Sequence, residues 1–483
     1  TNAPEEHYFN ASGYDLLGTL TDYAAERARV FSVKISDTGN GSYSFTLYGN
    51  LDHTGGDGTT LPLNFNFNAS DADGDDHPGN FTINIQDSVP LPSAPANLTI
   101  AESGVENYAH TVSGPVGIDW NGDIGAAKHL EFVGTPVGLK SGGDDLAYSI
   151  VADGDNKMLI AYREHDPAKA PVFTVQFTEA NPYYTFTLNQ PLDHNPASDT
   201  LTIPFTIRAT DSDGDQAVQT FNVTVTDSNP TAENVTGAMF ENDTIAVDLA
   251  GHYNFGTDGA NATNPLSLGT AYLSGVPAGV VITTLPTISL NPDGHTVSIN
   301  PGSTLDNLSD GQQLVLHIPF TVTDGDNDPV TKEILVTVTG TNDAPVLDLS
   351  GPSVAGNDVT TTAVEQLPQW FVNGATITDV DSGTMASLKV TLTSALDGAL
   401  EVLSLNTAAQ NAITANPGLS WSFDAATGVL LVTGVAATSV YKTILDGLVY
   451  INNSDNPTTT DRTIHVVVND GISDSAEQTA TLH

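Results

Sequence analysis

The sequence lacks cysteine altogether, in a chain of 483 residues. A secreted protein without disulfides needs another kind of cross-link, and a cytosolic protein of this length normally carries a few thiols. The sequence also lacks any apolar run long enough to cross a bilayer, and no signal peptide opens it. Because no apolar run is long enough, we expect no membrane insertion. Because the sequence begins at Thr1 without a methionine, we expect a piece of a longer chain.

Basic residues are the second scarcity. Only 13 Lys and Arg stand against 58 Asp and Glu, which gives a formal net charge of −45. Such a chain would repel phosphate groups, which argues against nucleic acids and anionic membrane surfaces as partners. The folded state also suffers self-repulsion unless cations bind. A uniformly acidic surface is one explanation, but the clustering of the acids at repeated positions favours metal binding.

What the sequence does contain is a repeat. YSFTLYGNLDH (43–53) matches YTFTLNQPLDH (184–194), and LPLNFNFNASDADGDD (61–76) matches LTIPFTIRATDSDGDQ (201–216). A looser copy covers 314–345, and a fourth ending covers 462–483. With Pro90, Pro230 and Pro345 as linkers, we predict four domains, named the first to fourth repeats: 1–90, 91–230, 231–345 and 346–483. The first is short at its front, either because the chain is cut within a domain or because the domain has lost or relocated that half.

Each repeat closes with the same strand pattern. Segments such as FNVTVTD (221–227) and LTIPFTIRATD (201–211) alternate apolar and polar residues with a period of two, as half-buried antiparallel strands do. Short strands of Thr, Val and Ile, punctuated by Gly and Pro, predict an all-β chain of tandem β-sandwiches. Helical periodicity is confined to short stretches near 21–29 and 438–448.

An acidic turn joins the last two predicted strands in three of the repeats. In the second repeat, Asp211, Asp213 and Asp215 occupy positions 1, 3 and 5 of the turn, and Gly214 allows the bend. Oxygen ligands at this spacing suit calcium, which takes about six to eight oxygens. An EF-hand is excluded because the Gly and Glu that its loop needs are missing. The same spacing recurs at Asp71, Asp73 and Asp75, and at Asp324, Asp326 and Asp328.

A second set of acids flanks the linkers. One strand separates each acidic turn from a further acid before the linker proline, and a glutamate follows soon after the linker. We expect these two groups to converge at one junction, where a bound calcium ion would clamp neighbouring domains. The alternative is that Asp-Gly turns are ordinary hairpin chemistry. The residues before the linkers are Asp87, Asp227, Asn342 and Asp343, and those after them are Glu102, Glu241 and Glu365.

These motifs resemble those of giant secreted repeat proteins. The segments 43–53, 61–76 and 81–90, with their second copies, are similar to the agglutination-type repeat of RTX adhesins that Gram-negative bacteria secrete by the type I system. TDGDND (323–328) and VTVTGTNDAP (336–345) resemble VCBS and bacterial cadherin-like repeats. ATITDVDSG (375–383) and VVVNDG (466–471) resemble another cadherin-like repeat. The resemblance implies Ig- or cadherin-like sandwiches, and calcium ligands that include Asp379, Asp381 and Asp470 besides the acids above.

By that resemblance the chain would be a calcium-stiffened, extracellular segment of a cell-surface adhesin. It would project or present binding modules in adhesion and biofilm formation, as a monomer that contacts neighbouring domains of the same long adhesin. An alternative stays open, in which the first or second repeat itself binds a host or microbial surface peptide or glycan. No GGxGxDxxx nonapeptide array occurs, so the secretion-signal region is not in this piece.

No motif supports an enzyme. HExxH, GxSxG and Walker loops are absent, and among so many carboxylates nothing selects the pair that a glycosidase needs. His53 and His194 occupy the same point of the repeat, the last residue of LDH, which favours a structural role at a strand end. Trp120 is a candidate platform for stacking a ligand, with core packing as the alternative.

Overall fold

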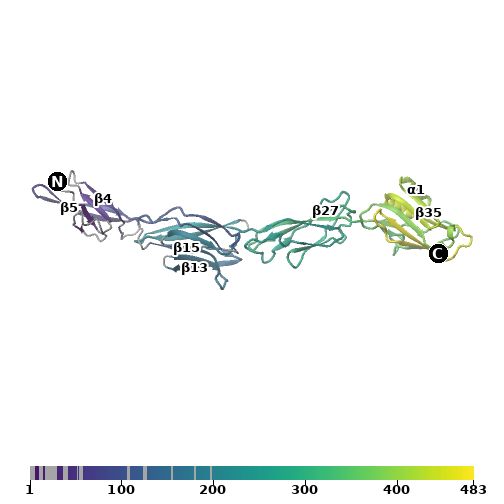
Figure 1. Cartoon of the computed structure of the whole chain (residues 1–483), viewed down its shortest axis with the longest axis horizontal. Helices are drawn as coiled ribbons and strands as arrows, with labels where there is room; N and C mark the ends of the chain where they lie inside the picture. Colours follow the sequence, from purple (N-terminus) through teal and green to yellow (C-terminus); the bar gives the residue numbers. More distant parts are fainter. Residues whose placement is uncertain are drawn as a thin grey trace. The chain divides into compact units, whose positions relative to one another are not determined.

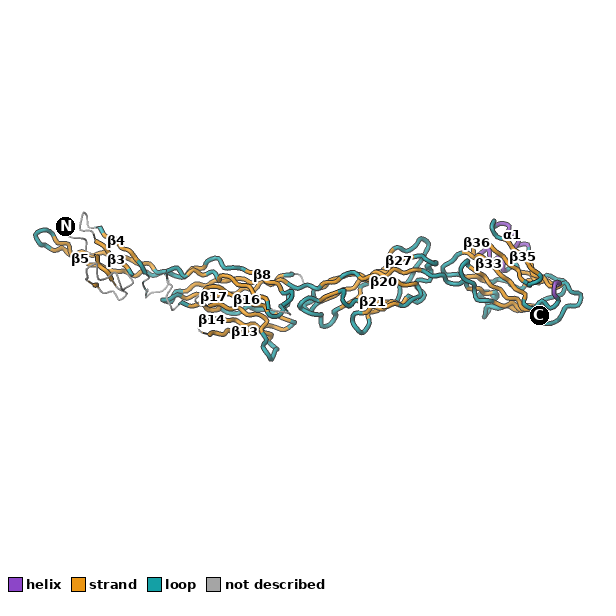
Figure 2. The backbone as a smooth tube through the Cα atoms, viewed as in Figure 1, coloured by secondary structure: helices purple, strands orange, loops and turns teal. Residues whose placement is uncertain are grey.

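The structure is a computed structural model that describes residues 6–9, 15–16, 30–35, 42–49, 51, 53, 58–105, 109–122, 128–153, 156–178, 181–195 and 198–483. Strands dominate these residues (Figure 2), which confirms the all-β class. The helical stretch predicted near 438–448 is confirmed by α2 (Thr438–Leu445), and α1 (Thr407–Ala415) was not predicted. The stretch at 21–29 lies outside the described residues.

The chain divides into two compact units. The first contains residues 1–231 together with 254–265 and 322–330, and the second contains the remainder. Two loops of the third repeat therefore belong to the same unit as the first and second repeats. Four domains remain the prediction from the sequence.

In the first repeat, a long hairpin of β5 (Thr60–Ser70) and β6 (Asp76–Gln86) closes around the acidic turn, with Ser70 paired to Asp76. Tyr43 of β4 stacks on Phe81 of β6, with ring centroids 4.2 Å apart. A four-stranded sheet has the order β2-β1-β3-β4. Its strands are β1 (Glu6–Phe9), β2 (Asp15–Leu16), β3 (Phe31–Ile35) and β4 (Tyr43–Leu47).

The second repeat is a two-sheet sandwich (Figure 1). Its core contains the stacked pairs Phe173–Phe186 and Phe205–Phe221, contributed by different sheets. The sheets have the orders β12-β13-β14-β15-β16-β9 and β11-β17-β18-β8. Their strands are β8 (Leu98–Ala101), β9 (His110–Pro115), β11 (His129–Phe132), β12 (Lys140–Ser141), β13 (Asp144–Asp153), β14 (Asn156–Arg163), β15 (Pro171–Thr178), β16 (Asn181–Leu188), β17 (Thr200–Thr210) and β18 (Gln216–Thr226); β7 (Leu91–Pro92) pairs with β10 (Ile118–Asp119).

The third repeat places β20-β28-β27-β23 in one sheet, with β24 paired to β27, and β21-β26-β25 in another. Alternate residues of β27 and β28, such as Leu316, Phe320 and Val336, are fully buried, as the period-two pattern predicted. The strands are β20 (Val235–Phe240), β21 (Ile245–Asp248), β23 (Leu266–Leu268), β24 (Tyr272–Ser274), β25 (Thr287–Leu290), β26 (Thr296–Asn300), β27 (Gln313–Thr323) and β28 (Pro329–Thr339); β19 (Thr231–Ala232) and β22 (Tyr253–Asn254) are shorter.

The fourth repeat has a six-stranded sheet, β30-β39-β38-β33-β36-β35, and a three-stranded sheet, β31-β37-β34. The helix α2 packs on β33 and β36 and buries Tyr441, Ile444 and Leu445 in the core. The strands are β30 (Val359–Thr361), β31 (Gln369–Trp370), β33 (Thr384–Leu392), β34 (Glu401–Leu405), β35 (Ser420–Asp424), β36 (Val429–Ala437), β37 (Leu448–Asn452), β38 (Arg462–Asn469) and β39 (Gln478–Leu482); β29 (Val346–Asp348) pairs with β32 (Thr376–Thr378), and η1 spans Gly398–Leu400.

One parallel strand pair recurs in the last three repeats and positions the glutamates. β8 runs parallel to β18, with Ile100 opposite Val225, while β20 runs parallel to β28 and β30 to β39. A strand parallel to the last strand of its own repeat ends where that last strand ends. The glutamate that follows it therefore lies at the exit end of the repeat, one strand length from the linker before it.

Candidate metal centres

The three acidic turns have the same backbone. The first Asp N–H donates to the carbonyl of the fifth residue, over 3.2 Å from Asp71 to Asp75 and 3.0 Å from Asp211 to Asp215. The fourth residue has a positive φ in each turn, at Gly74, Gly214 and Asn327. The turns differ in burial, because the acids of 71–75 are exposed whereas Asp211 is 2% exposed and Asp324 is fully buried. The full sets are Asp71, Asp73 and Asp75; Asp211, Asp213 and Asp215; and Asp324, Asp326 and Asp328.

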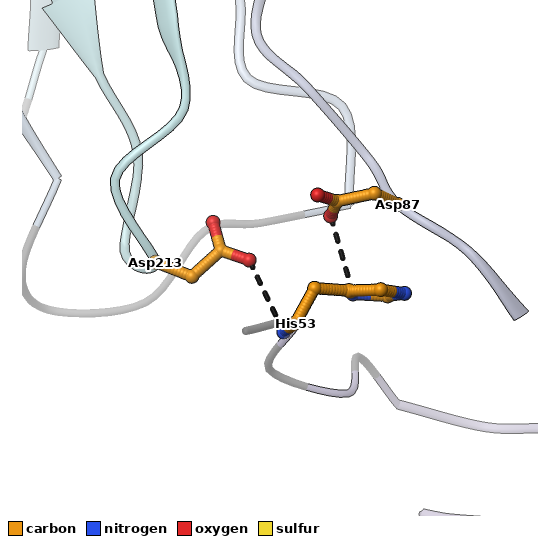
Figure 3. A group of neighbouring side chains, drawn as sticks. All are labelled: His53, Asp87 and Asp213. Carbon is orange, nitrogen blue, oxygen red and sulfur yellow. Dashed lines mark hydrogen bonds and ion pairs between the residues drawn. The ribbon is translucent and has the colours of Figure 1, made fainter. Parts of the chain in front are cut away.

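The first centre joins His53 and Asp87 of the first repeat to Asp213 of the second (Figure 3). The His53 N–H donates to Asp213 Oδ2 over 3.3 Å, and its ring Nδ1 lies 3.2 Å from Asp87 Oδ1. The neighbouring Asp211 is buried beside Asp213, and burial followed by that neighbour raises its pKa to about 6. The acid before the first linker thus meets the acidic turn of the second repeat, a contact that was not predicted, since the sequence paired that acid with the glutamate after the linker.

The second centre repeats this geometry one repeat later. The His194 N–H donates to Asp326 Oδ2 over 2.9 Å, and Asp227, Asp258 and Asp326 place carboxylate oxygens within 4.8 Å of one another. Glu102 is fully buried at the same place, where its Oε1 accepts the Leu192 N–H over 2.8 Å. All of these residues belong to the first compact unit.

The second centre concentrates negative charge in a small buried volume. Burial, reinforced by the neighbouring carboxylates, raises the pKa of Glu102 to about 9 and that of Asp258 to about 7. Burial and Asp326 likewise raise the pKa of Asp324 to about 8. Several oxygens here have no hydrogen-bond partner among the described residues: Glu102 Oε2, Asp227 Oδ2, Asp258 Oδ2, Asp324 Oδ2 and Asp326 Oδ1. Buried polar groups are ordinarily satisfied, so these orphaned oxygens fit a bound cation.

The third centre lies in the second compact unit, between the third and fourth repeats. Glu241 Oε1 accepts the Thr341 N–H over 2.6 Å, and Ser309 Oγ donates to the carbonyl of Asp381 over 2.7 Å. Burial, with Asp379 beside it, raises the pKa of Asp381 to about 7. The orphaned oxygens in this part of the chain are Glu241 Oε2, Asp306 Oδ1, Asp343 Oδ2, Asp379 Oδ2 and Asp381 Oδ1.

A cavity opens beside the third centre. It measures about 290 Å³ and is lined by Asp343, Ala344, Val346, Thr378, Asp379 and Val380.

Two other predicted ligands are in contact here, because Asn342 Nδ2 donates a hydrogen bond to Asp470 Oδ2 over 3.0 Å. Predicted ligands from VTGTNDAP, TDVDSG and VVVNDG are therefore close together, although they are distant in the sequence.

One predicted pairing is wrong. Glu102 was expected beside Asp87, and Glu241 beside Asp227, as groups on two sides of a linker. Instead Glu102 lies with Asp227 and Glu241 lies near Asp343, because β8 and β20 run parallel to the last strand of their own repeats. Glu365 is exposed after β30, and the same parallel pairing carries it to the β39 end of the fourth repeat, away from Asp343.

Two ligand candidates were missed by reading the sequence. Asp258, in TDG (257–259), has no counterpart in the segments that were matched between repeats. Asp306 stands in LDN (305–307), the looser copy of the LDH at 192–194, so aligning the third repeat to the second would have found it. Both have an orphaned carboxylate oxygen at their centre.

Trp120 lies in the core of the second repeat. Its ring is 7% exposed, and Lys128 Nζ lies 5.5 Å from the ring centroid. This burial matches the packing role weighed above and leaves no open ring face for a ligand.

A polar chain on the third repeat has the order of a hydrolase triad. Ser274 Oγ lies 2.7 Å from His317 Nε2, and His317 Nδ1 lies 3.2 Å from Glu333 Oε2. Tyr272 stacks on the imidazole and donates to Glu333 Oε1 over 2.8 Å. The residues sit side by side on β24, β27 and β28, and catalysis would also require a pocket and oxyanion donors. We interpret this series of hydrogen bonds as cross-strand contacts that stabilise the sheet.

Comparisons with known proteins add a resemblance of fold. No family model matches the chain. No curated protein matches it either. Solved cadherin extracellular domains are similar to it: Drosophila N-cadherin EC1-4 is 12% identical, with 98% of this chain and 97% of that chain covered and a TM-score of 0.26. Protocadherin gamma B2 domains 3–6 are 13% identical, with 87% and 83% covered and a TM-score of 0.22.

Helices are few and short throughout the part of the chain that the structure describes. Among those residues, no helix combines the length and the apolar character that crossing a bilayer requires.

Proposed function

We propose that the chain is a calcium-stiffened, extracellular segment of a bacterial surface adhesin, which projects or presents binding modules in adhesion and biofilm formation. One observation carries the proposal: carboxylates from successive repeats gather at the junctions, and several of their buried oxygens have no hydrogen-bond partner among the described residues. Secretion by the type I system and a place at the cell surface rest on the resemblance of the repeats to RTX adhesins.

The donor set selects the cation. Calcium takes about six to eight oxygen ligands from carboxylates, carbonyls and water, in a flexible geometry. Carboxylates dominate the second centre, with the imidazole of His194 beside them, whereas thiolates, which would favour softer metals, do not occur in this sequence. The residues that would hold calcium there are Glu102, Asp227, Asp258, Asp324, Asp326 and Asp328, and at the third centre they are Glu241, Asp306, Asp343, Asp379 and Asp381.

Calcium would work as a clamp because the second and third centres each draw on two repeats. Asp227 comes from the second repeat and Asp326 from the third, so one ion binding both would tie the two repeats together. Without the ion, the same carboxylates repel each other and favour separation. Binding in the folded state alone would add about 2.7 kcal/mol per site at a hundredfold excess of calcium over Kd.

The competing function, direct binding of a peptide or glycan by the first or second repeat, has weaker support. Trp120, the aromatic candidate for such a site, is buried. An array of peptides and glycans, probed with the full chain in calcium and in EDTA, would detect such binding.

The proposal is tested by calcium titration and calorimetry on the full chain. We expect Tm to be higher in calcium than in EDTA. The double variant Asp227→Asn with Asp326→Asn should show a smaller rise, because it loses most of the contribution of the second centre. Glu164→Gln serves as the control, because it removes a negative charge from an exposed position of the second repeat. An unchanged melting profile between calcium and EDTA would refute the clamp.

A further inference from the structure

The first centre contains a nitrogen ligand candidate, the imidazole of His53, which calcium would not be expected to use because it prefers oxygen ligands. Its side chain is 4% exposed, and that of Asp87 is 1% exposed. Ring Nε2 lies 3.1 Å from the carbonyl oxygen of Ile85, while ring Nδ1 faces Asp87 Oδ1 at 3.2 Å. Nδ1, Asp87 Oδ2 and Asp213 Oδ1 have no hydrogen-bond partner among the described residues.

The hydrogen bond at Nε2 determines what Nδ1 can do. When the Nε2–H donates to a backbone carbonyl, the neutral imidazole carries its lone pair on Nδ1. A lone pair directed at a carboxylate oxygen is repulsive unless a cation lies between them. A second nitrogen anchored on a carbonyl is the arrangement that orients histidine ligands in metal sites.

We infer that His53 Nδ1, Asp87 and Asp213 bind a divalent transition-metal ion of the zinc type, distinct from the calcium ions proposed for the other centres. Imidazole with carboxylates is a donor set for zinc, whereas calcium prefers oxygen alone. The inference does not depend on calcium binding elsewhere, because it uses only these three residues.

The spacing agrees with such an ion. Two ligands about 2.0–2.1 Å from a tetrahedral ion lie about 3.3 Å apart, close to the 3.2 Å between His53 Nδ1 and Asp87 Oδ1. Ligand atoms of all three residues lie within 4.8 Å of one another. Three protein ligands leave a fourth position for water, as in open zinc sites.

The second repeat provides an internal control, since His194 stands at the same point of its LDH motif. Its Nδ1 lies 2.9 Å from the Leu192 carbonyl oxygen and its Nε2 lies 3.3 Å from that of Val225. Glu102 Oε2 and Asp227 Oδ1 are each 3.7 Å from Nδ1, beyond the edge of a tetrahedral site. Glu102, His194 and Asp227 also form a group that could hold an ion. It differs from the first centre because His194 Nδ1 has a carbonyl partner, whereas His53 Nδ1 has no hydrogen-bond partner among the described residues, and because its nitrogen-to-oxygen distances are longer.

The competing occupant of the first centre is a proton. An imidazolium at His53 would form an ion pair with Asp87 and satisfy both groups without a metal. The two occupants differ in a measurable way, because only the metal site gives saturable binding and a coordination spectrum.

The test uses the full chain, stripped with EDTA and returned to millimolar calcium so that oxygen-only sites are filled. Zinc is titrated by calorimetry, and cobalt(II) replaces it as a spectroscopic probe. We expect one high-affinity zinc equivalent and the intense visible bands of tetrahedral cobalt. His53→Gln should weaken zinc binding by about tenfold to a hundredfold, whereas His194→Gln should leave zinc binding unchanged.

Several results would overturn the inference. These are no saturable zinc binding in calcium, equal binding by His53→Gln and the parent, or equal loss in His194→Gln. If His53→Gln fails to fold, Asp213→Asn tests the same site from the other repeat, with thermal melting as the check on folding. If the chain binds zinc but not calcium, the proposed calcium clamp is refuted and the zinc site at His53 is still supported.

Discussion

At the scale of single residues, Arg462 supplies a positive charge from the chain itself to a pair of carboxylates in the fourth repeat. Its side chain is 5% exposed, and its guanidinium lies 2.7 Å from Asp397 Oδ2 and 3.1 Å from Glu401 Oε1. Tyr450 completes the network by donating its hydroxyl to Glu401 Oε2 over 3.1 Å. Here buried carboxylates of the fourth repeat meet a cation of the chain itself, so this network should need no metal ion.

Arg462→Met is expected to destabilise the fourth repeat by about 3–5 kcal/mol, because it removes the cation that faces the buried Glu401 carboxylate and the half-buried Asp397 carboxylate. Lys442→Met is the matched control, since Lys442 pairs with Asp446 on the surface, where such a pair contributes about 0–1 kcal/mol. Urea unfolding followed by hydrogen exchange in β38 measures both, with and without calcium. Equal stability of the two variants would mean that the network contributes little.

At the scale of elements, the hairpins and their acidic turns were predictable and the parallel pairing was not. Period-two alternation and the DSDGD spacing led to β17, β18 and the turn between them, including burial of alternate residues. Alternation does not state which strand lies beside which, so the parallel position of β8 against β18 was hidden, and with it the location of Glu102. Asp258 was missed for a related reason, because a loop residue that joins a site through tertiary contact has no local pattern.

Gly214→Ala tests the turn as an element. The φ of Gly214 is +112°, and nothing lies within 4 Å of the position that a Cβ would take, so the cost should come from backbone strain alone. We expect a loss of about 1–3 kcal/mol and weaker calcium binding. Gly383→Ala is the control, because its site is equally open and its φ lies outside the left-handed range. A parent-like Tm for Gly214→Ala would show that the turn tolerates a side chain.

At the scale of the whole chain, a net charge of −45 and buried carboxylates act in the same direction. Burial raises the pKa values of Glu102, Asp258 and Asp324 to about 9, 7 and 8, above their ordinary values near 4. A carboxyl with a raised folded pKa binds more protons folded than unfolded. Its contribution to stability is therefore complete below about pH 4 and is lost as the pH rises through the folded pKa.

The sign of the pH dependence should consequently reverse with calcium. In EDTA, Tm of the first compact unit should fall as the pH rises from about 5 to 9, because burial then opposes ionisation and exposed acids add repulsion. In millimolar calcium, Tm should rise over the acidic part of this range, because protons and calcium compete for the same oxygens. Calorimetry at pH 5, 7 and 9 in both buffers measures the two slopes. Slopes of the same sign would mean that the buried carboxylates are not the calcium ligands, even if calcium stabilises the chain by another route.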